Sequence, residues 1–425
     1  MKATDFLRLR KATAISYALL FTLAIAAFAA GILHRPDGFE SADTPSYIRA
    51  SYRLMAGEID ALRTPVYPFI IALVRSLAGT ELLNRSIVIL QCGVYLLSAF
   101  FLMLTLRNLK VNQWITLIAT AIYALFPGFY IFCFILNTEA FAQSFVVFFG
   151  WSMLRDAGRT PRISSALLSG TWLFILIFLR PAMICLIPVY IIYWAALYFK
   201  FRRGALKSCA AALCCLLMLG VAISCYKGAV KAKCGVSTIS VVAAVNNYYL
   251  VRETKILRPH HTGNPAFQAM LHERADSIII TDDGWVDFHE AEYLLATLRV
   301  PPADVSDAVN AAIKENPGAC LRLMPVRFRR ACCSYTVLPV PPRIAPYFPM
   351  RMLWYWLLMG ASLVWLILRR SSMQLWVLWL TSAAISACAI LGAMNDWCRL
   401  SLPAMSMALM LAAVICSRIK AKLCG

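Results

Sequence analysis

The chain alternates long apolar segments with short basic loops, and this pattern predicts a helical membrane protein. A helix needs about 20 apolar residues to cross a bilayer. Ten segments approach or reach this length: residues 14–33, 87–106, 114–126, 140–154, 164–179, 182–199, 208–225, 353–368, 375–391 and 400–416. The shorter apolar stretch 69–78 is interrupted by Arg75, so we expect it to lie in the membrane interface. We therefore predict an all-α polytopic membrane protein with about ten transmembrane helices.

Lysine and arginine gather at alternate ends of the predicted spans. The clusters lie within residues 8–11, 107–110, 155–162, 200–207, 369–370 and 418–422. Because cytoplasmic loops of membrane proteins carry an excess of these residues, the pattern predicts that both termini are cytoplasmic. Counting residues 69–78 as a span would invert every later loop and destroy this agreement. The net charge of +20 is explained by this topology without a nucleic-acid surface.

Composition supports the same class. The chain is 61% hydrophobic and 15% charged, whereas soluble domains have about 25% charged residues. Three regions follow from the polarity: residues 1–225 with a first outer loop at 34–85, a polar outer region at 226–351, and the last spans at 352–425. The outer region should be folded and mostly helical. Its arginines either contact membrane phosphates or a partner or, as we expect, form a solvated basic face: Arg322, Arg327, Arg329 and Arg330.

Cysteines and histidines give no defined site. Most cysteines lie in apolar runs, where they behave as small hydrophobic residues. Four lie in the polar region, where a disulfide pairing cannot be assigned from sequence: Cys234, Cys320, Cys332 and Cys333. The histidines lack metal-ligand spacings such as HExxH. We therefore expect no cofactor, and nothing supports a divalent metal.

Residues 40–68 bring carboxylates, arginines and tyrosines together at a predicted membrane surface. Thr44 and Pro45 suit a helix start, and Gly57 suits its end. The result is a short amphipathic helix in the interface, with Asp43 at its N-terminus. Asp43 is either a helix cap or a functional carboxylate, and Tyr47 lies on the apolar face of the helix.

A second carboxylate, Glu139, stands at the junction of two predicted spans. Asn137 and Thr138 precede it and are good helix caps, and a glutamate is favourable at a positive helix N-terminus. Plain capping is one interpretation. The other is function, because a carboxylate near the hydrocarbon boundary is costly and is retained mainly where it is used.

Three arginines fall on the same predicted side of the membrane. Arg63 starts a run that continues to Tyr67 and Pro68, Arg180 precedes a proline, and Arg399 follows Asp396. Arg180 could instead extend to the headgroups, and Arg399 could simply pair with Asp396. The planar guanidinium suits oxyanions, so three arginines with two carboxylates predict a site for an anionic lipid phosphate beside an acid or base.

These motifs resemble the C-type (membrane-embedded) glycosyltransferases, in the branch of aminoarabinose transferase and the protein O-mannosyltransferases. The resemblance rests on an acidic residue followed by an amphipathic helix, an R-T-P-x-Y-P run, a Thr-Glu turn, an arginine before Leu-Pro, and an Asn-Pro. These are residues 43–56, 63–68, 138–139, 399–403 and 316–317. The chain departs from the closest relatives in having one acidic residue at Asp43 and fewer spans than the larger members.

The resemblance implies transfer of a sugar, with inversion, from a polyprenyl-phosphate donor to an acceptor hydroxyl at the outer membrane face. The acceptor would be a lipid, glycan or protein, as in lipopolysaccharide or protein glycosylation, most simply at a bacterial inner membrane. Asp43 and Glu139 would be catalytic, with Asp43 orienting or deprotonating the acceptor. The remaining candidates are Arg63, Arg180 and Arg399 for the donor phosphate and Tyr47, Tyr67 and Asp396 for substrate.

Two other functions compete with this one. A glycolipid transporter or flippase would predict internal repeats, midplane charges and interrupted helices, and none of these is evident in the sequence. A membrane scaffold without catalysis would not need carboxylates and arginines on one outer face.

Overall fold

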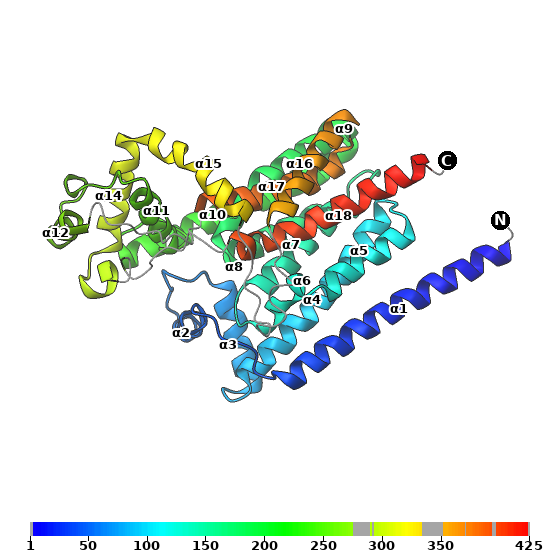
Figure 1. The fold of residues 1–425 in the computed structure, drawn as a ribbon, viewed down its shortest axis with the longest axis horizontal. Coiled ribbons are helices and arrows are strands. Elements are labelled where there is room, and N and C mark those ends of the chain that lie inside the picture. Colours follow the sequence, from blue (N-terminus) through cyan, green and yellow to red (C-terminus); the bar gives the residue numbers. More distant parts are fainter. Residues whose placement is uncertain are drawn as a thin grey trace.

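The structure is a computed structural model that describes residues 3–274, 290, 293–333, 352–369, 371–392 and 397–423. The regular elements in these residues are helices (Figure 1). Phe39 and Ile135 form a single isolated parallel bridge. The all-α class is confirmed, and the protein is an integral membrane protein.

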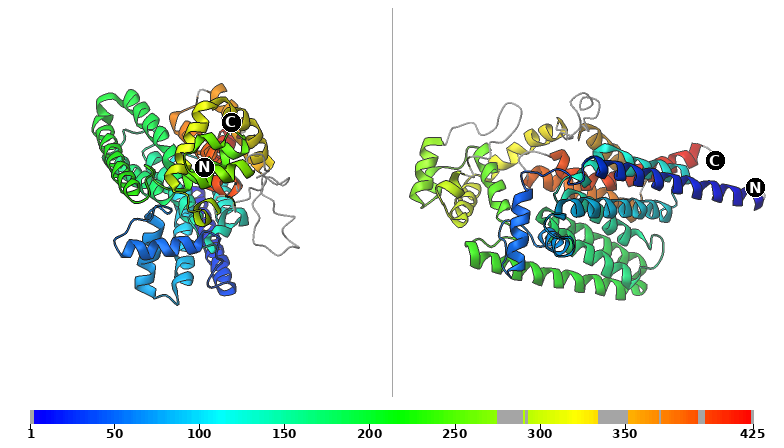
Figure 2. Two further views of the ribbon diagram at one scale, coloured as in Figure 1. Left: turned by 90° about the vertical axis from the view of Figure 1, so that its left-hand side faces the viewer. Right: turned by 90° about the horizontal axis from the view of Figure 1, so that it is seen from below.

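Each of the ten apolar segments forms a helix. These helices are α1 (Ala3–His34), α4 (Leu83–Asn108), α5 (Gln113–Leu125), α7 (Glu139–Leu154), α8 (Ile163–Leu179), α9 (Leu186–Phe201), α10 (Leu206–Cys234), α16 (Met352–Leu368), α17 (Met373–Gly392) and α18 (Trp397–Leu423). They pack side by side, and both ends of the described chain lie at the same end of the bundle (Figures 1 and 2).

By length and composition alone, fewer helices qualify as membrane spans than the ten predicted. Among the described residues, five helical segments are long and apolar enough to cross a membrane, or six if a bent pair counts as one. One of the five is the run Pro181–Cys234, in which the short η3 (Arg202–Ala205) joins α9 to α10. Several others, such as α8 and α16, are apolar but have only 17 residues each. The expected number of ten is thus not reached by this criterion.

The connection between α1 and α4 carries two short helices, α2 (Thr44–Met55) and α3 (Val66–Ala78). Thr44 begins α2 and Pro45 follows it, but the Thr44 hydroxyl does not cap the helix as expected and instead donates to the carbonyl oxygen of Leu136 at 2.8 Å. Gly57 just beyond the helix has a φ of +75°. Such a left-handed conformation favours glycine. Helix α2 runs across the long direction of α1 (Figures 1 and 2), an orientation that suits a helix lying in a membrane interface.

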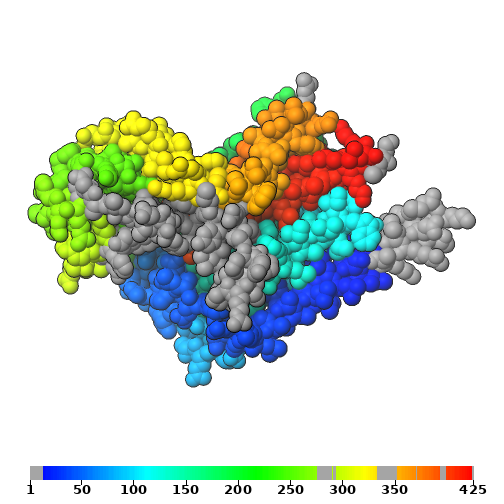
Figure 3. Space-filling view, viewed as in Figure 1, coloured from blue at the N-terminus to red at the C-terminus, as the bar shows by residue number. Residues whose placement is uncertain are grey.

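The polar region forms a small helical lobe beside the bundle, here called the α11–α15 lobe (Figure 3). Its elements are α11 (Val242–Glu253), η4 (Pro259–His261), α12 (Pro265–Arg274), the π-helix η5 (Tyr293–Thr297), α14 (Pro302–Glu315) and α15 (Pro317–Cys333). A separate hydrophobic cluster that includes Tyr248, Phe267 and Val309 holds it together. Cys234 and Cys320 carry free thiols, so no disulfide joins those two, and the Cys333 side chain lies outside the described residues.

An ion-pair cluster ties this lobe to the bundle. Glu253 at the end of α11 pairs with Arg327 at 2.9 Å and also with Arg330 on α15. Arg327 Nη1 also donates to the carbonyl oxygens of Ile390 and Leu391 near the end of α17. The expectation of a solvated basic face is therefore wrong for Arg327, whose side chain is 1% exposed, because its charge is satisfied by a buried carboxylate.

Candidate active site

A bent segment after α5 delivers Glu139 to the site. Helix α5 turns by 55° into residues 127–134, which comprise α6 (Pro127–Tyr130) and η1 (Ile131–Phe134). The expectation that no helix is interrupted is therefore wrong here, since Pro127 cannot continue the hydrogen bonding of α5. Gln91 on α4 donates from Nε2 to the carbonyl oxygens of Cys133 and Ile135, at 2.9 and 3.0 Å. Together with the Phe39–Ile135 bridge, these bonds fasten the segment between α4 and the α1–α4 connection. The start of α7 is thereby held next to the residues that precede α2.

Asp43 stands immediately before α2, but its side chain makes no capping hydrogen bond to that helix. Instead, Asp43 Oδ1 accepts a hydrogen bond from Arg63 Nη2 at 2.5 Å. Arg63 also donates from Nε to Ser46 Oγ at 2.8 Å and lies over the Tyr47 ring, 4.3 Å from its centroid. Plain capping therefore does not describe Asp43.

The surroundings of Asp43 keep it ionised. Burial alone would raise the pKa of its carboxyl group, but the nearby Arg63 and the more distant Arg399 outweigh burial and lower the pKa below its ordinary value. Burial raises the pKa of Tyr47, so its hydroxyl stays protonated. The pair thus offers a carboxylate acceptor next to a neutral phenol.

Asp60, which the sequence did not single out, positions Arg63. Its Oδ1 accepts the backbone N–H groups of Leu62 and Arg63 at 2.8 and 2.9 Å, and its Oδ2 pairs with Arg53 at 2.8 Å. A carboxylate that binds backbone amides two and three residues ahead is a known turn-forming device. That local signal was present in the sequence, but it identifies a turn and not its role beside a site.

Glu139 is the first residue of α7 and is 2% exposed. Its Oε1 lies 3.5 Å from Arg180 Nη2 and 3.5 Å from Arg399 Nε. Arg180 follows the last residue of α8 in an extended conformation, and Arg399 lies in the first turn of α18. Among the described residues, Glu139 Oε2 and Arg180 Nη1 are buried without a hydrogen-bond partner.

These contacts give Glu139 more than a capping role. The expected caps are not formed, since the Thr138 side chain makes no capping hydrogen bond to α7 and Asn137 Oδ1 accepts the N–H of Thr138 itself at 2.8 Å. Because buried polar atoms are nearly always satisfied, the unpartnered atoms of Glu139 and Arg180 indicate polar groups held ready for a ligand or for water.

One cavity of about 460 Å³ unites six of the eight predicted residues. They are Asp43, Tyr47, Arg63, Glu139, Arg180 and Arg399. This volume is within the range of small-molecule sites. Three arginines against two carboxylates leave an excess positive charge, and apolar residues such as Leu179, Met183, Ile385 and Leu400 complete the wall.

The other two predicted residues are not part of this lining. Tyr67 is buried against the Tyr47 ring, with centroids 4.9 Å apart, so it supports the cavity from behind. Asp396 lies outside the described residues. The cavity also includes Asn246 and Asn247 of α11, which sequence reasoning missed because nothing local links α11 to the first loop.

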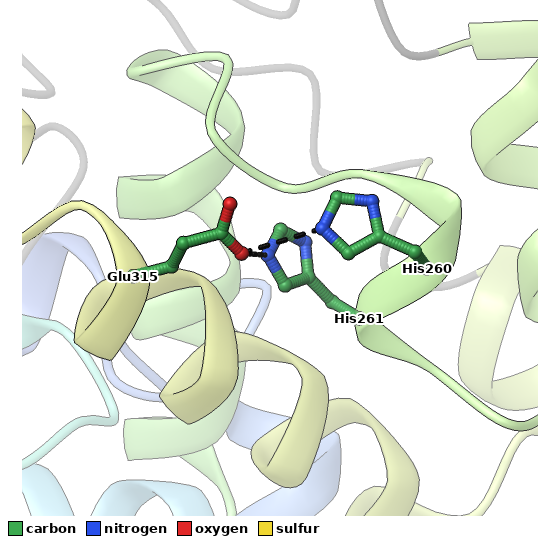
Figure 4. Close-up of side chains that lie close together, drawn as sticks. All are labelled: His260, His261 and Glu315. Atoms are coloured by element: carbon green, nitrogen blue, oxygen red, sulfur yellow. Dashed lines mark hydrogen bonds and ion pairs between the residues drawn. The ribbon is translucent and has the colours of Figure 1, made fainter.

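Two adjacent histidines, His260 and His261, lie close to Glu315 in the α11–α15 lobe (Figure 4), and none of the three lines the cavity. Nε2 of His261 and Nε2 of His260 lie 2.7 and 3.3 Å from Glu315 Oε2. His261 Nδ1 accepts the Arg258 backbone N–H at 2.9 Å, so Nε2 carries the proton and donates to Glu315. A metal bound to Nε2 would require the proton to move to Nδ1, and a protonated Nδ1 could not accept the Arg258 N–H. The arrangement therefore fits hydrogen bonding better than metal binding.

Residues 62–226 match the family described as dolichyl-phosphate-mannose-protein mannosyltransferase. This region resembles a membrane glycosyltransferase. The match supports a glycosyltransferase of the C type and confirms the resemblance inferred from the motifs. The matched glycosyltransferase-like region contains Arg63, Glu139 and Arg180, whereas Asp43 and Arg399 lie outside it. No curated protein matches the chain.

Proposed function

We propose that this protein transfers a sugar from a polyprenyl-phosphate donor to an acceptor hydroxyl at the outer face of a membrane, with inversion at the anomeric carbon. One observation carries the proposal. An ionised Asp43 and two arginines, Arg180 and Arg399, line the same cavity. The reaction needs both, since it must take up a proton and release an anionic phosphate.

Arg180 and Arg399 would bind the donor phosphate. Each lies 3.5 Å from Glu139 Oε1, which is longer than a strong charge-assisted hydrogen bond of about 2.7–2.9 Å. Their guanidinium groups come from the ends of two different helices, α8 and α18. In this proposal, Glu139 holds the arginines in place before the donor binds, and the phosphate then binds Arg399 and the unpartnered Nη1 of Arg180.

Asp43 would orient the acceptor hydroxyl and receive its proton. As the acceptor oxygen bonds to the anomeric carbon from the opposite face, the bond from that carbon to the phosphate oxygen breaks. The proton passes to Asp43, and the polyprenyl phosphate leaves with its charge stabilised by the arginines. A carboxylate of lowered pKa is a weak base, so we expect proton transfer to follow most of the bond breaking. No step requires a metal or cofactor.

The proposed topology follows from the reaction. Both described chain ends lie at the same end of the bundle, opposite the α11–α15 lobe (Figure 1). We propose that these ends are cytoplasmic, that the lobe and the cavity face the outer compartment, and that the membrane is a bacterial inner membrane. Residues 1–225, 226–351 and 352–425 would then serve as the first membrane module, the outer region and the last spans.

The test is transfer of labelled sugar from polyprenyl-phosphate donors, with wild type compared to Asp43→Asn in purified membranes. Asp37→Asn is a matched control, because Asp37 lies in the same loop, is exposed and pairs only distantly with Arg85 at 3.6 Å. We expect Asp43→Asn to lose at least about a hundredfold in rate, at unchanged abundance and with only the small fall in melting temperature that loss of the ion pair to Arg63 causes, and the control to keep its activity. Equal transfer by wild type and Asp43→Asn would remove Asp43 from the chemistry. Movement of intact donor lipid across the bilayer without sugar transfer would instead support a flippase.

A further inference from the structure

The α11–α15 lobe contributes an uncharged polar edge to the cavity. Its lining residues are Ser240, Val242, Ala243, Asn246 and Asn247. By contrast, the charged lining residues all come from the α1–α4 connection and from α7, α8 and α18. The lobe therefore adds no charge to the cavity, and its polar groups there are a hydroxyl and two amides.

Backbone and side-chain contacts fix the start of α11 next to Arg63. Ser240 Oγ donates to the carbonyl oxygen of Leu62 at 2.6 Å, and the Val241 N–H donates to that of Ala61 at 2.9 Å. Arg63 in turn holds Asp43. The uncharged polar edge therefore lies on the Asp43 side of the cavity, where the acceptor hydroxyl would bind.

We propose that Asn246 and Asn247 bind the acceptor, and that the acceptor is a neutral, hydroxyl-rich group such as a glycan. This rests on the function proposed above. A carboxamide offers two donors and an acceptor oxygen, which matches neighbouring sugar hydroxyls that both donate and accept. A peptide acceptor fits less well, because peptide recognition commonly uses a strand edge or an extended groove. The described residues offer a cavity of about 460 Å³, and they include no strand edge beside it.

The variants are Asn246→Ala, Asn247→Ala and the double substitution in the full-length protein. Asn310→Ala is the matched control. It removes the same side-chain amide, but from an exposed position on α14 outside the cavity lining. Neither asparagine is assigned a role in the chemistry, so donor hydrolysis in the absence of acceptor reports separately on the phosphate side of the site.

The assay uses labelled polyprenyl-phosphate mannose with two acceptors, a neutral oligosaccharide and a serine- and threonine-containing peptide. We expect the double variant to raise KM for the oligosaccharide about tenfold or more, as loss of two hydrogen bonds would, with donor hydrolysis and the control unchanged. An unchanged KM, or a wild-type enzyme that glycosylates only the peptide, would overturn the inference and leave the transfer function standing. Absence of both transfer and donor hydrolysis in wild type would overturn the proposed function, and the inference with it.

Discussion

Arg63 reaches across 20 residues of sequence to place its Nη2 2.5 Å from Asp43 Oδ1. The same guanidinium lies over the Tyr47 ring, so one arginine fixes both the carboxylate and the aromatic side chain that border the cavity. This contact explains why the pKa of Asp43 is lowered although burial acts to raise it.

Arg63→Met should move the acid limb of the activity profile to higher pH. Without Arg63, burial raises the pKa of Asp43 largely unopposed. In wild type, the depressed pKa means that the ion pair stabilises the folded state above the ordinary carboxyl pKa. This contribution is lost only as pH falls through the depressed value. The measurement is the activity of each variant as a function of pH, normalised to its own maximum, which gives the pH at which the acid limb falls.

Arg53→Met serves as its control, because Arg53 pairs with Asp60 and not with Asp43. Superimposable acid limbs in wild type and Arg63→Met would mean that Asp43 does not set the lower pH limit of activity.

Arg180→Ala and Arg399→Ala should each lower kcat/KM by about 10²–10³, the usual loss when one group that stabilises developing charge is removed. Arg180→Lys should recover only part, because it keeps the charge but not the planar fork. The measurement is initial rate against donor concentration. Arg85→Gln, at an exposed arginine that pairs with Asp37, should leave the rate unchanged.

Removal of Arg180 also leaves Glu139 with less compensation for its burial, so stability must be separated from catalysis. In a Glu139→Gln background, Arg180→Ala should still reduce the rate while the melting temperature recovers. If the rate recovered together with the melting temperature, Arg180 would be a structural partner of Glu139 and not a phosphate ligand.

Asp60→Ala should both destabilise the protein and weaken catalysis. The variant loses an acceptor for two backbone amides, Leu62 and Arg63, at a cost of about 1–3 kcal/mol if those groups stay buried and unpaired. Arg53→Gln removes only the partner of Asp60 that is 43% exposed and should cost about 1 kcal/mol or less. Thermal unfolding reports the first effect, and kcat/KM for the acceptor reports the second. A stable Asp60→Ala with wild-type kinetics would show that Arg63 does not depend on this turn.

Glu253→Gln should weaken the attachment of the α11–α15 lobe to α17. The substitution leaves the Arg327 charge, 1% exposed, without its carboxylate, and breaking a buried pair in this way costs about 3–5 kcal/mol. We expect a lower melting temperature and faster proteolysis within the lobe. Glu58→Gln is the control, because Glu58 is 57% exposed and its pairing with Lys233 spans 3.4 Å. Equal proteolysis of both variants would show that the buried cluster does not hold the lobe.

The sequence by itself determined the helices and most of the candidate residues. Burial of apolar side chains in a bilayer requires long helical segments, so each of the ten apolar runs could be located. The charges and the short motifs then placed Asp43, Glu139, Arg63, Arg180 and Arg399 at helix ends on one predicted side of the membrane. The number of spans was less well determined, because apolar helices of 16 or 17 residues cannot be assigned as crossing from composition alone.

Only the tertiary structure decided which of these residues meet and how they are paired. Whether Asp43 capped α2 or bound Arg63 depended on the turn at Asp60, and the contacts of Glu139 depended on helices more than 200 residues apart in sequence. Arg327 was placed wrongly because its buried partner, Glu253, is brought to it by packing of α15 on α11 and α17. Asn246 and Asn247 could not be foreseen, since α11 reaches the cavity through backbone hydrogen bonds to the first loop. Such contacts between distant segments leave no local pattern, because they are set by how the helices pack.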